Sequence, residues 1–173
     1  MKHFSELTEQ EVLALAISLE EEHQKIYSEY AAGLSSDFPH SAKVFDEMAA
    51  EESEHRRWLI ELHRQKFGER IPLVRRQDVS GFVRHPALWL SPPLVLDTVR
   101  KQAEAVEYET RTFYERAAER TTDASIRKLL GDLAVAERGH ESLAVKLGDE
   151  LTKSGAAATE DDMRQRMFVL QVV

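Results

Sequence analysis

The sequence predicts an all-α protein: a bundle of four long helices with a long crossover between the second and the third. Three observations support this prediction. Apolar residues recur at steps of three and four along most of the chain, whereas the alternating pattern of strands is almost absent. Capping residues and glycines divide this pattern into four segments. About 23 residues separate the two middle segments, which is too many for a tight antiparallel turn.

The first two helices have recognisable ends. The first is predicted over residues 8–32, because TEQE, beginning at Thr8, forms a capping-box pattern and Gly33 is a helix-ending residue. The loop SSDFPH follows. The second helix is predicted over residues 41–67 and should end at Gly68.

The other two helices are bounded in the same way. The third is predicted to begin with Ser91 as its N-cap and Pro92 at its first helical position, and to continue to about Arg120. The fourth is predicted to start near Asp123 and to end within residues 148–151. Four long helices with one long middle crossover have the connectivity of ferritin-like bundles.

The chain is expected to contain one such domain, residues 1–153. Residues 154–173 are predicted to form a linker, SGAAAT, and the start of a further helix that ends on apolar residues.

Composition excludes several classes of protein. The net charge of −8 argues against binding to nucleic acid or to an anionic membrane, since both require basic patches. The sequence has no cysteine, which excludes disulfides, thiolate metal sites and iron–sulfur clusters. MKHFSELTEQ lacks the apolar stretch of a secretory signal, and no window has the ~20 apolar residues of a membrane span, so a cytoplasmic location is expected.

Two charged residues interrupt the core-facing seam of the second helix, meaning the positions separated alternately by three and four residues. The interruptions are Glu52 and His55, whereas Glu51 and Glu54 lie off the seam and should be solvated. The apolar members of the seam are Phe45, Met48, Leu59 and Leu62.

The fourth helix repeats this pattern, since its seam is interrupted by Glu137 and His140, again as Glu-x-x-His. On the first helix Glu20 and His23 interrupt the seam. On the third helix Glu107 lies at the edge of the apolar stripe, and Glu104 lies further round the helix, off the stripe.

A buried array of carboxylates repels itself unless cations lie between its members, so these positions predict a metal site. Carboxylate oxygen with imidazole nitrogen suits iron or manganese. One Glu from each of two helices with Glu-x-x-His from each of the other two is the di-iron carboxylate pattern. The alternative for Glu20 and Glu107 is a buried structural acid, and His23 is expected to be structural or to support a ligand.

Tyrosines recur at equal distances from two of these glutamates. Tyr27 follows Glu20 by seven residues and Tyr114 follows Glu107 by seven, so the two halves of the chain resemble each other. Their hydroxyls are predicted either to pack only or to orient ligand carboxylates. Because of this register, Glu107 is the predicted bridging carboxylate.

The phrases FDEMAAEESEHRRWL and DLAVAERGHESL resemble the second and fourth helices of the rubrerythrin (erythrin) branch of the ferritin-like superfamily. This resemblance implies a di-iron site holding two iron ions, Fe(II) or Fe(III), with manganese as the alternative metal. It also implies a homodimer. In that branch one third-helix glutamate and a histidine exchange as ligands with the oxidation state of iron, which adds Glu104 as a terminal or exchanging ligand. The implied ligands are Glu20, Glu52, His55, Glu104, Glu107, Glu137 and His140.

The chain departs from rubrerythrins in lacking the cysteines of their second iron site. The start MKHFSELTEQEV, the long crossover and RMFVLQVV most resemble the membrane-bound ferritin A family, in which an erythrin domain precedes a membrane domain of the vacuolar-iron-transporter type. That resemblance implies the cytoplasmic part of an iron exporter of the bacterial inner membrane, with the membrane domain outside this chain.

The expected function is therefore to bind Fe(II) and to oxidise it with O2 or hydrogen peroxide, serving iron efflux and peroxide resistance. The alternatives are a stand-alone rubrerythrin-type peroxidase or ferroxidase, and a metal-free helical interaction module.

Overall fold

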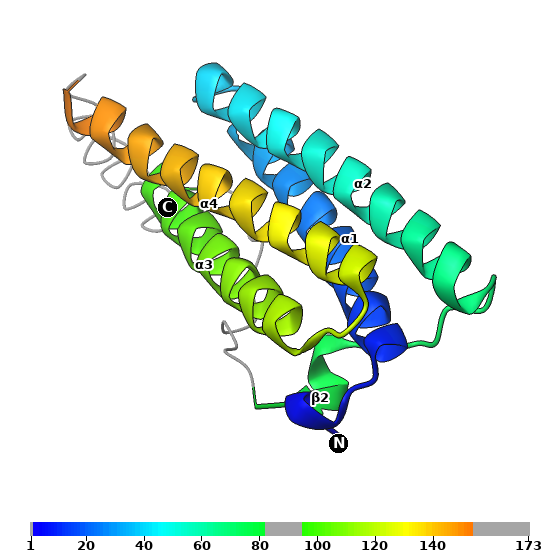
Figure 1. Ribbon diagram of the computed structural model, residues 1–173. Coiled ribbons are helices and arrows are strands. Elements are labelled where there is room, and N and C mark those ends of the chain that lie inside the picture. The colour runs from blue at the N-terminus through cyan, green and yellow to red at the C-terminus, as the bar shows by residue number, and fades with distance from the viewer. Residues whose placement is uncertain (1, 82–94, 154–173) are drawn as a thin grey trace.

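The computed structural model describes residues 2–81 and 95–153, without the side chains of 148–153. Four long helices make up most of it (Figure 1). They are α1 (Glu9–Leu34), α2 (Pro39–Phe67), α3 (Leu96–Arg120) and α4 (Ala124–Lys153). The short elements are β1 (Lys2–His3), η1 (Phe4–Glu6), η2 (Arg76–Asp78) and β2 (Val79–Ser80). Within the described ranges, no helix has the length and apolar character needed to cross a membrane.

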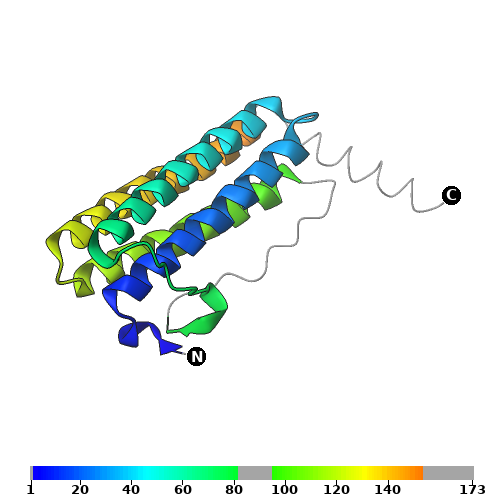
Figure 2. The same ribbon diagram turned by 90° about the vertical axis from the view of Figure 1, so that its right-hand side faces the viewer.

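The helices form two antiparallel hairpins that face each other. α1 packs along α2, and α3 packs along α4 (Figures 1 and 2). α2 and α3 run in the same direction, so the chain between them joins opposite ends of the bundle. The predicted four-helix bundle with a long crossover is therefore confirmed.

α1 starts where the sequence predicted, but it ends later than predicted. Thr8 Oγ1 accepts the backbone N–H of Glu11 at 3.2 Å, and the Glu11 carboxylate accepts the Thr8 N–H at 3.0 Å, which completes the predicted capping box. The predicted end before Gly33 is wrong. Gly33 does not have positive φ, and the helix continues to Leu34, whose side chain is fully buried in the core.

α2 begins two residues earlier than predicted, because Pro39 occupies its first turn rather than the preceding loop. Proline is suited to this position, where its missing N–H has no intrahelical partner. The predicted end at Gly68 is confirmed. Gly68 has φ of 84°, a left-handed conformation that costs glycine little, and its N–H binds the Arg64 carbonyl at 3.0 Å.

α3 begins later than predicted. Val95 is extended, with φ of −90° and ψ of 119°, so a continuous helix from Pro92 is wrong; Ser91 and Pro92 themselves lie outside the described residues. The predicted cap of α4 is confirmed, because Asp123 Oδ1 accepts the N–H groups of Ser125 and Ile126. The predicted linker and further helix over 154–173 also lie outside the described residues.

The crossover is joined to the start of the chain by a parallel pair of two-residue strands, β1 and β2, which the sequence did not predict. Gly81 follows β2 with φ of 88°, and a Cβ there would lie 2.1 Å from Nε2 of His3. Glycine is therefore required where the crossover passes over the His3 ring.

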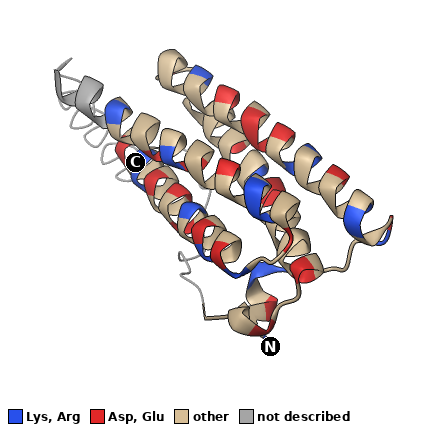
Figure 3. Ribbon diagram, viewed as in Figure 1, with Lys and Arg blue, Asp and Glu red and all other residues tan. Residues whose placement is uncertain are grey.

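Charged side chains of both signs are interspersed along the helices (Figure 3). Many are exposed neighbours on one helix, such as Lys128 with Asp132 at 2.5 Å and Arg57 with Glu54 at 2.7 Å. Exposed pairs of this kind contribute little to the free energy of unfolding, because water and salt screen them. They explain much of the charge in the sequence but not the buried acids.

The apolar core is divided into two clusters by a polar layer at mid-length. One cluster joins the first half of α1 with the second half of α3 and the first half of α4, and includes Leu13, Leu15, Phe113, Ile126 and Leu130. The other joins the opposite halves, and includes Tyr30, Leu34, Phe45, Val99 and Ala144. Each interior-facing Glu and His predicted from the seams lies between these clusters.

Candidate metal centre

Six titratable side chains converge in the polar layer, and every helix contributes at least one. All six are buried, with at most 4% of any residue exposed. They are Glu20 from α1, Glu52 and His55 from α2, Glu107 from α3, and Glu137 and His140 from α4. The i, i+3 spacing places each Glu-x-x-His pair about one turn apart on one face of its helix.

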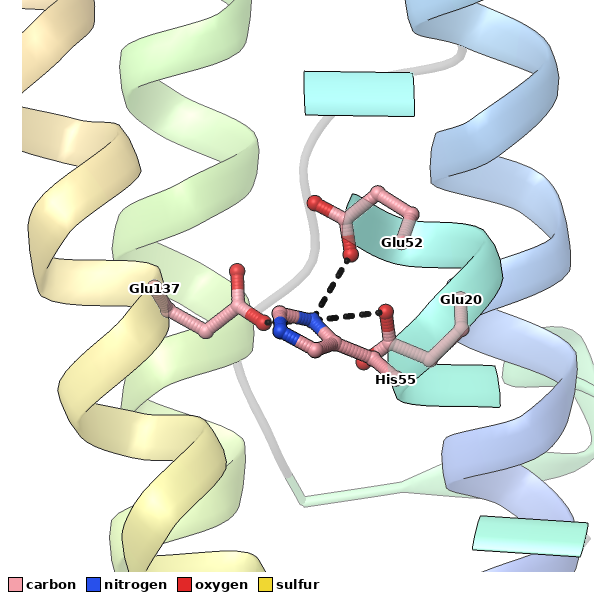
Figure 4. Close-up of side chains that lie close together, drawn as sticks. All are labelled: Glu20, Glu52, His55 and Glu137. Carbon is pink, nitrogen blue, oxygen red and sulfur yellow. Dashed lines mark ion pairs between the residues drawn. The ribbon is translucent and has the colours of Figure 1, made fainter. Parts of the chain in front are cut away.

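Three carboxylates surround Nδ1 of His55 (Figure 4). Oxygens of Glu52, Glu20 and Glu137 lie 3.4, 3.6 and 3.7 Å from this nitrogen. One ligand atom from each of the four residues lies within 4.8 Å of every other. Such a group surrounds a volume suited to a single metal ion.

A second group of the same composition surrounds Nδ1 of His140. Oxygens of Glu52, Glu107 and Glu137 lie 3.2, 3.5 and 3.7 Å from it. These four residues also bring their ligand atoms within 4.8 Å of one another. The His55 and His140 rings are stacked at an angle of 27°, with centroids 6.0 Å apart.

Glu52 and Glu137 belong to both groups, and each divides its two oxygens between them. Oε2 of Glu52 faces His55 while Oε1 faces His140; Oε1 of Glu137 faces His55 while Oε2 faces His140. A carboxylate in this arrangement can bridge two metal ions. Glu107 belongs to one group only, so the geometry does not support the bridging role predicted for it from the sequence.

The two tyrosines pair across the bundle rather than along their own helices. The Tyr27 hydroxyl on α1 donates a hydrogen bond to Glu107 on α3, and the Tyr114 hydroxyl on α3 donates to Glu20 on α1. Because α1 and α3 run in opposite directions, the equal seven-residue spacing brings each hydroxyl to the other helix's glutamate. The alternative in which these hydroxyls orient carboxylates is therefore the one observed.

Many polar atoms of this cluster are buried without a hydrogen-bond partner among the described residues, which is unusual. Both oxygens of Glu52 and of Glu137, and Nδ1 of both histidines, have no hydrogen-bond partner among the described residues. Buried polar atoms are nearly always satisfied, because each one left unsatisfied costs about 1–3 kcal/mol. These atoms point at one another, as ligands around a cation do.

Several groups of the site have pKa values that favour their protonated forms at neutral pH. Burial and the charge of Glu52 raise the pKa of Glu20 to about 8, and burial with the charges of Glu52 and Glu107 raises the pKa of Glu137 well above its usual value. Burial lowers the pKa of His55, but contacts with the Glu20 and Glu52 carboxylates outweigh it and raise the pKa to about 9. Protons thus replace part of the positive charge that a metal pair would supply.

The remaining ligand implied by the resemblance, Glu104, is not part of either group. Its side chain is 42% exposed and pairs with Arg100 at 3.3 Å. His23, which was expected to be structural or supporting, is fully buried and outside both groups, with Nε2 3.4 Å from Nη2 of Arg76 in η2.

Glu51 is exposed, as its position off the seam predicted, yet it contacts the site. Its Oε2 lies 2.9 Å from Nε2 of His140, the ring nitrogen that faces away from the carboxylates. The seam pattern of one helix did not reveal this contact, because it joins α2 to α4.

Comparisons with known proteins identify the family and the fold. The Rubrerythrin family profile matches residues 11–148. A hypothetical protein from Pyrococcus furiosus superimposes with a TM-score of 0.68 at 21% identity, covering 86% of this chain and 92% of its own.

A protein from Thermotoga maritima, provisionally named a ferritin-like diiron-carboxylate protein, superimposes with a TM-score of 0.65 at 20% identity, covering 83% of this chain and 96% of its own. A search of curated protein sequences gives no match. The family match covers most of every helix and contains all six converging residues. This chain therefore belongs to the rubrerythrin family, with the four-helix fold of ferritin-like diiron proteins.

Proposed function

We propose that this protein binds a pair of iron ions between its four helices and oxidises Fe(II) there. The observation that carries the proposal is the division of the Glu52 and Glu137 oxygens between two otherwise separate groups. A single-metal site needs only one such group, whereas two groups that share two carboxylates suit two ions ~3.5–4 Å apart.

The charge of the site supports the same assignment. The four converging glutamates carry four negative charges when ionised, which equals the charge of two divalent cations. Carboxylate oxygens with two imidazole nitrogens suit iron, and manganese is the alternative metal. A metal-free helical module has no use for unpaired buried acids, since replacing such groups by apolar residues is often neutral or stabilising.

Each residue then has a definite part. Glu52 and Glu137 would hold both ions, Glu20 and His55 would complete one position, and Glu107 and His140 would complete the other. The two apolar clusters above and below exclude water from the layer. A bound pair of Fe(II) ions would supply two electrons at a single place, one from each ion.

Either O2 or hydrogen peroxide can accept the two electrons that a pair of Fe(II) ions gives up. O2 takes one electron from each of two Fe(II) ions together with two protons and becomes hydrogen peroxide. Hydrogen peroxide takes the same two electrons and two protons and becomes two molecules of water. Fe(II) is the substrate in both cases, and the retained protons on Glu20 and His55 are displaced when it binds.

Anaerobic titration with Fe(II), followed by a pulse of O2, tests this function. We expect two Fe(II) bound per chain, and one O2 consumed for every two Fe(II) oxidised when a peroxidase with its reducing substrate removes the hydrogen peroxide that forms. The Glu52→Gln variant is the negative control. Binding of one ion or none, or oxidation no faster than in the variant, would contradict the proposal.

The tyrosine contacts make a prediction of their own. Tyr114→Phe removes the donor to Glu20 and Tyr27→Phe removes the donor to Glu107, while the phenyl ring still fills the core. Each variant should lower metal affinity by ~10–100-fold at one of the two positions, because an oriented ligand loses its supporting contact. Mn(II) titration followed by calorimetry measures this.

Tyr108→Phe is the matched control, because Tyr108 lies on α3 but is 49% exposed. Unchanged affinity at both positions in the Tyr27→Phe, Tyr114→Phe double variant would show that these hydroxyls only pack.

We further propose that this iron chemistry serves iron efflux and peroxide resistance, with the chain acting as a homodimer on the cytoplasmic face of a bacterial inner membrane, as part of an iron exporter. The support is the resemblance of MKHFSELTEQEV, the long crossover and RMFVLQVV to the membrane-bound ferritin A family. The lack of cysteine also favours a separate electron donor over a built-in one.

Deletion of the gene in its own host tests this role. The deletion strain should retain more iron and grow less well in peroxide, and a Glu52→Gln gene should fail to restore it. Normal iron content with peroxide sensitivity alone would favour the stand-alone peroxidase instead.

A further inference from the structure

An exposed carboxylate contacts one histidine of the metal centre. Glu51 lies one residue before Glu52 on α2, with 59% of its side chain exposed, and its carboxylate is 2.9 Å from Nε2 of His140, whose side chain is 3% exposed. The other ring nitrogen of His140, Nδ1, faces Glu52, Glu107 and Glu137. His140 thus spans from the surface of the protein to the interior of the site.

The two halves of the site differ at this point. In the repeat of Glu-x-x-His, the residue that corresponds to Glu51 is Ala136, which has no carboxylate. Among the described residues, the only carboxylate contacts of His55 are made by Nδ1, and its ring lies 5.5 Å from that of Trp58. An otherwise near-symmetric site therefore has a carboxylate behind one imidazole and not behind the other.

We infer that Glu51 is a positioning residue for metal binding by His140. This inference rests on the proposed metal site. Glu51 accepts the Nε2–H of His140, which holds the ring with Nδ1 toward the carboxylates and increases the electron density that Nδ1 offers to a cation. Carboxylates that accept the outer N–H of a ligand histidine commonly raise metal affinity by ~10–100-fold.

The exposure of Glu51 places the expected effect at the lower end of this range, because water competes for its oxygens. The Glu51 contact makes the position lined by Glu107 and His140 the tighter of the two, and therefore the first to fill. The position lined by Glu20 and His55 fills second.

Anaerobic titration of the full chain with Co(II), followed by visible absorption, tests the role of Glu51. The unmodified chain should bind two Co(II) in two resolved steps. Glu51→Ala should weaken one step by about tenfold and leave the other unchanged. Glu51→Gln should lose less, since its amide oxygen still accepts the Nε2–H.

Glu47→Ala is the matched control. Glu47 lies one turn before Glu51 on the same helix, is 62% exposed, and pairs with Lys43. The Glu47→Ala substitution removes the same charge from the same surface of the protein, but Glu47 does not contact a ligand. The Co(II) titration of this variant should therefore match that of the unmodified chain.

A second readout separates positioning from a general effect on folding. In the proton NMR spectrum of the Co(II)-loaded protein, each ligand imidazole gives a strongly shifted, exchangeable N–H signal. The His140 signal should exchange slowly in the unmodified chain and in Glu47→Ala, and become broad or disappear in Glu51→Ala, while the His55 signal is unchanged.

Three results would overturn the inference. Glu51→Ala could bind both ions as the unmodified chain does, which would show that the contact does no positioning. Glu47→Ala could lose as much affinity as Glu51→Ala, which would reduce the effect to surface charge. If the unmodified chain binds no Co(II) or Fe(II), the proposed function fails and the role of Glu51 fails with it.

Discussion

Replacing Glu52 with glutamine is expected to remove both metal ions, whereas replacing Glu20 with glutamine should weaken only one. Glu52 offers one oxygen to each group, so losing its charge affects both positions, and Glu20 belongs to the His55 group alone. In Glu52→Gln the metal affinity at each position should fall by more than the ~10–100-fold that removal of a supporting contact to a ligand causes. Mn(II) stoichiometry measured by calorimetry distinguishes the two variants.

Glu54→Gln is the control for charge on α2, because Glu54 is exposed and pairs with Arg57 at 2.7 Å. It should bind two ions normally. Retention of one ion at full affinity in Glu52→Gln would show that the two groups are independent, and would contradict the bridged arrangement.

Metal binding is expected to raise the melting temperature of the protein considerably. Without metal, buried carboxylates and imidazoles remain poorly satisfied, and the unfolded chain lacks the assembled site. A ligand present at 100 times its dissociation constant adds about 2.7 kcal/mol to the free energy of unfolding. For a chain of this size that corresponds to a shift of ~5–10 °C.

Differential scanning calorimetry at neutral pH, with and without Mn(II), measures this shift. Glu52→Gln should melt at the same temperature in both conditions. An equal shift in the variant would mean that the ion binds elsewhere, for instance at the acidic surface.

The interior face of each helix could be predicted from sequence because it is a local property. Apolar residues at alternating steps of three and four fix which side of a helix faces the core, and Glu52, His55, Glu137 and His140 interrupt that side. All four are buried, as the pattern required. The same periodicity placed Glu104 off the stripe, where the structure has it paired with Arg100.

The roles within the site could not be predicted in the same way. Periodicity gives the face of a helix but not how far a side chain reaches across the bundle, so it could not show that Glu137 rather than Glu107 has an oxygen in each group. The Tyr27 contact with Glu107 and the Glu51 contact with His140 each join two helices. They depend on the direction and offset of the helices, which local patterns do not encode.

The predicted helix boundaries were wrong where a residue can take either of two structural roles. Gly33 can end a helix or lie inside one, and the burial of Leu34 favours continuation. Pro39 can belong to a loop or to a first helical turn, and it takes the second role. In both cases packing against the rest of the bundle determined the outcome.

The division of the core explains why the site can exist in so small a bundle. The apolar clusters on either side of the polar layer each contain buried residues from all four helices, so the helices pack together on both sides of the site. Side chains placed on packed helices need less ordering when a metal binds than side chains on loops do.

Anomalous X-ray diffraction from crystals loaded anaerobically with Mn(II) tests the central claim most directly. The bridged arrangement predicts two anomalous peaks ~3.5–4 Å apart in the polar layer. Glu52 and Glu137 should contact both peaks, with His55 Nδ1 and Glu20 on one and His140 Nδ1 and Glu107 on the other. A single peak, a pair bridged by Glu107, or peaks only among the surface carboxylates would contradict it.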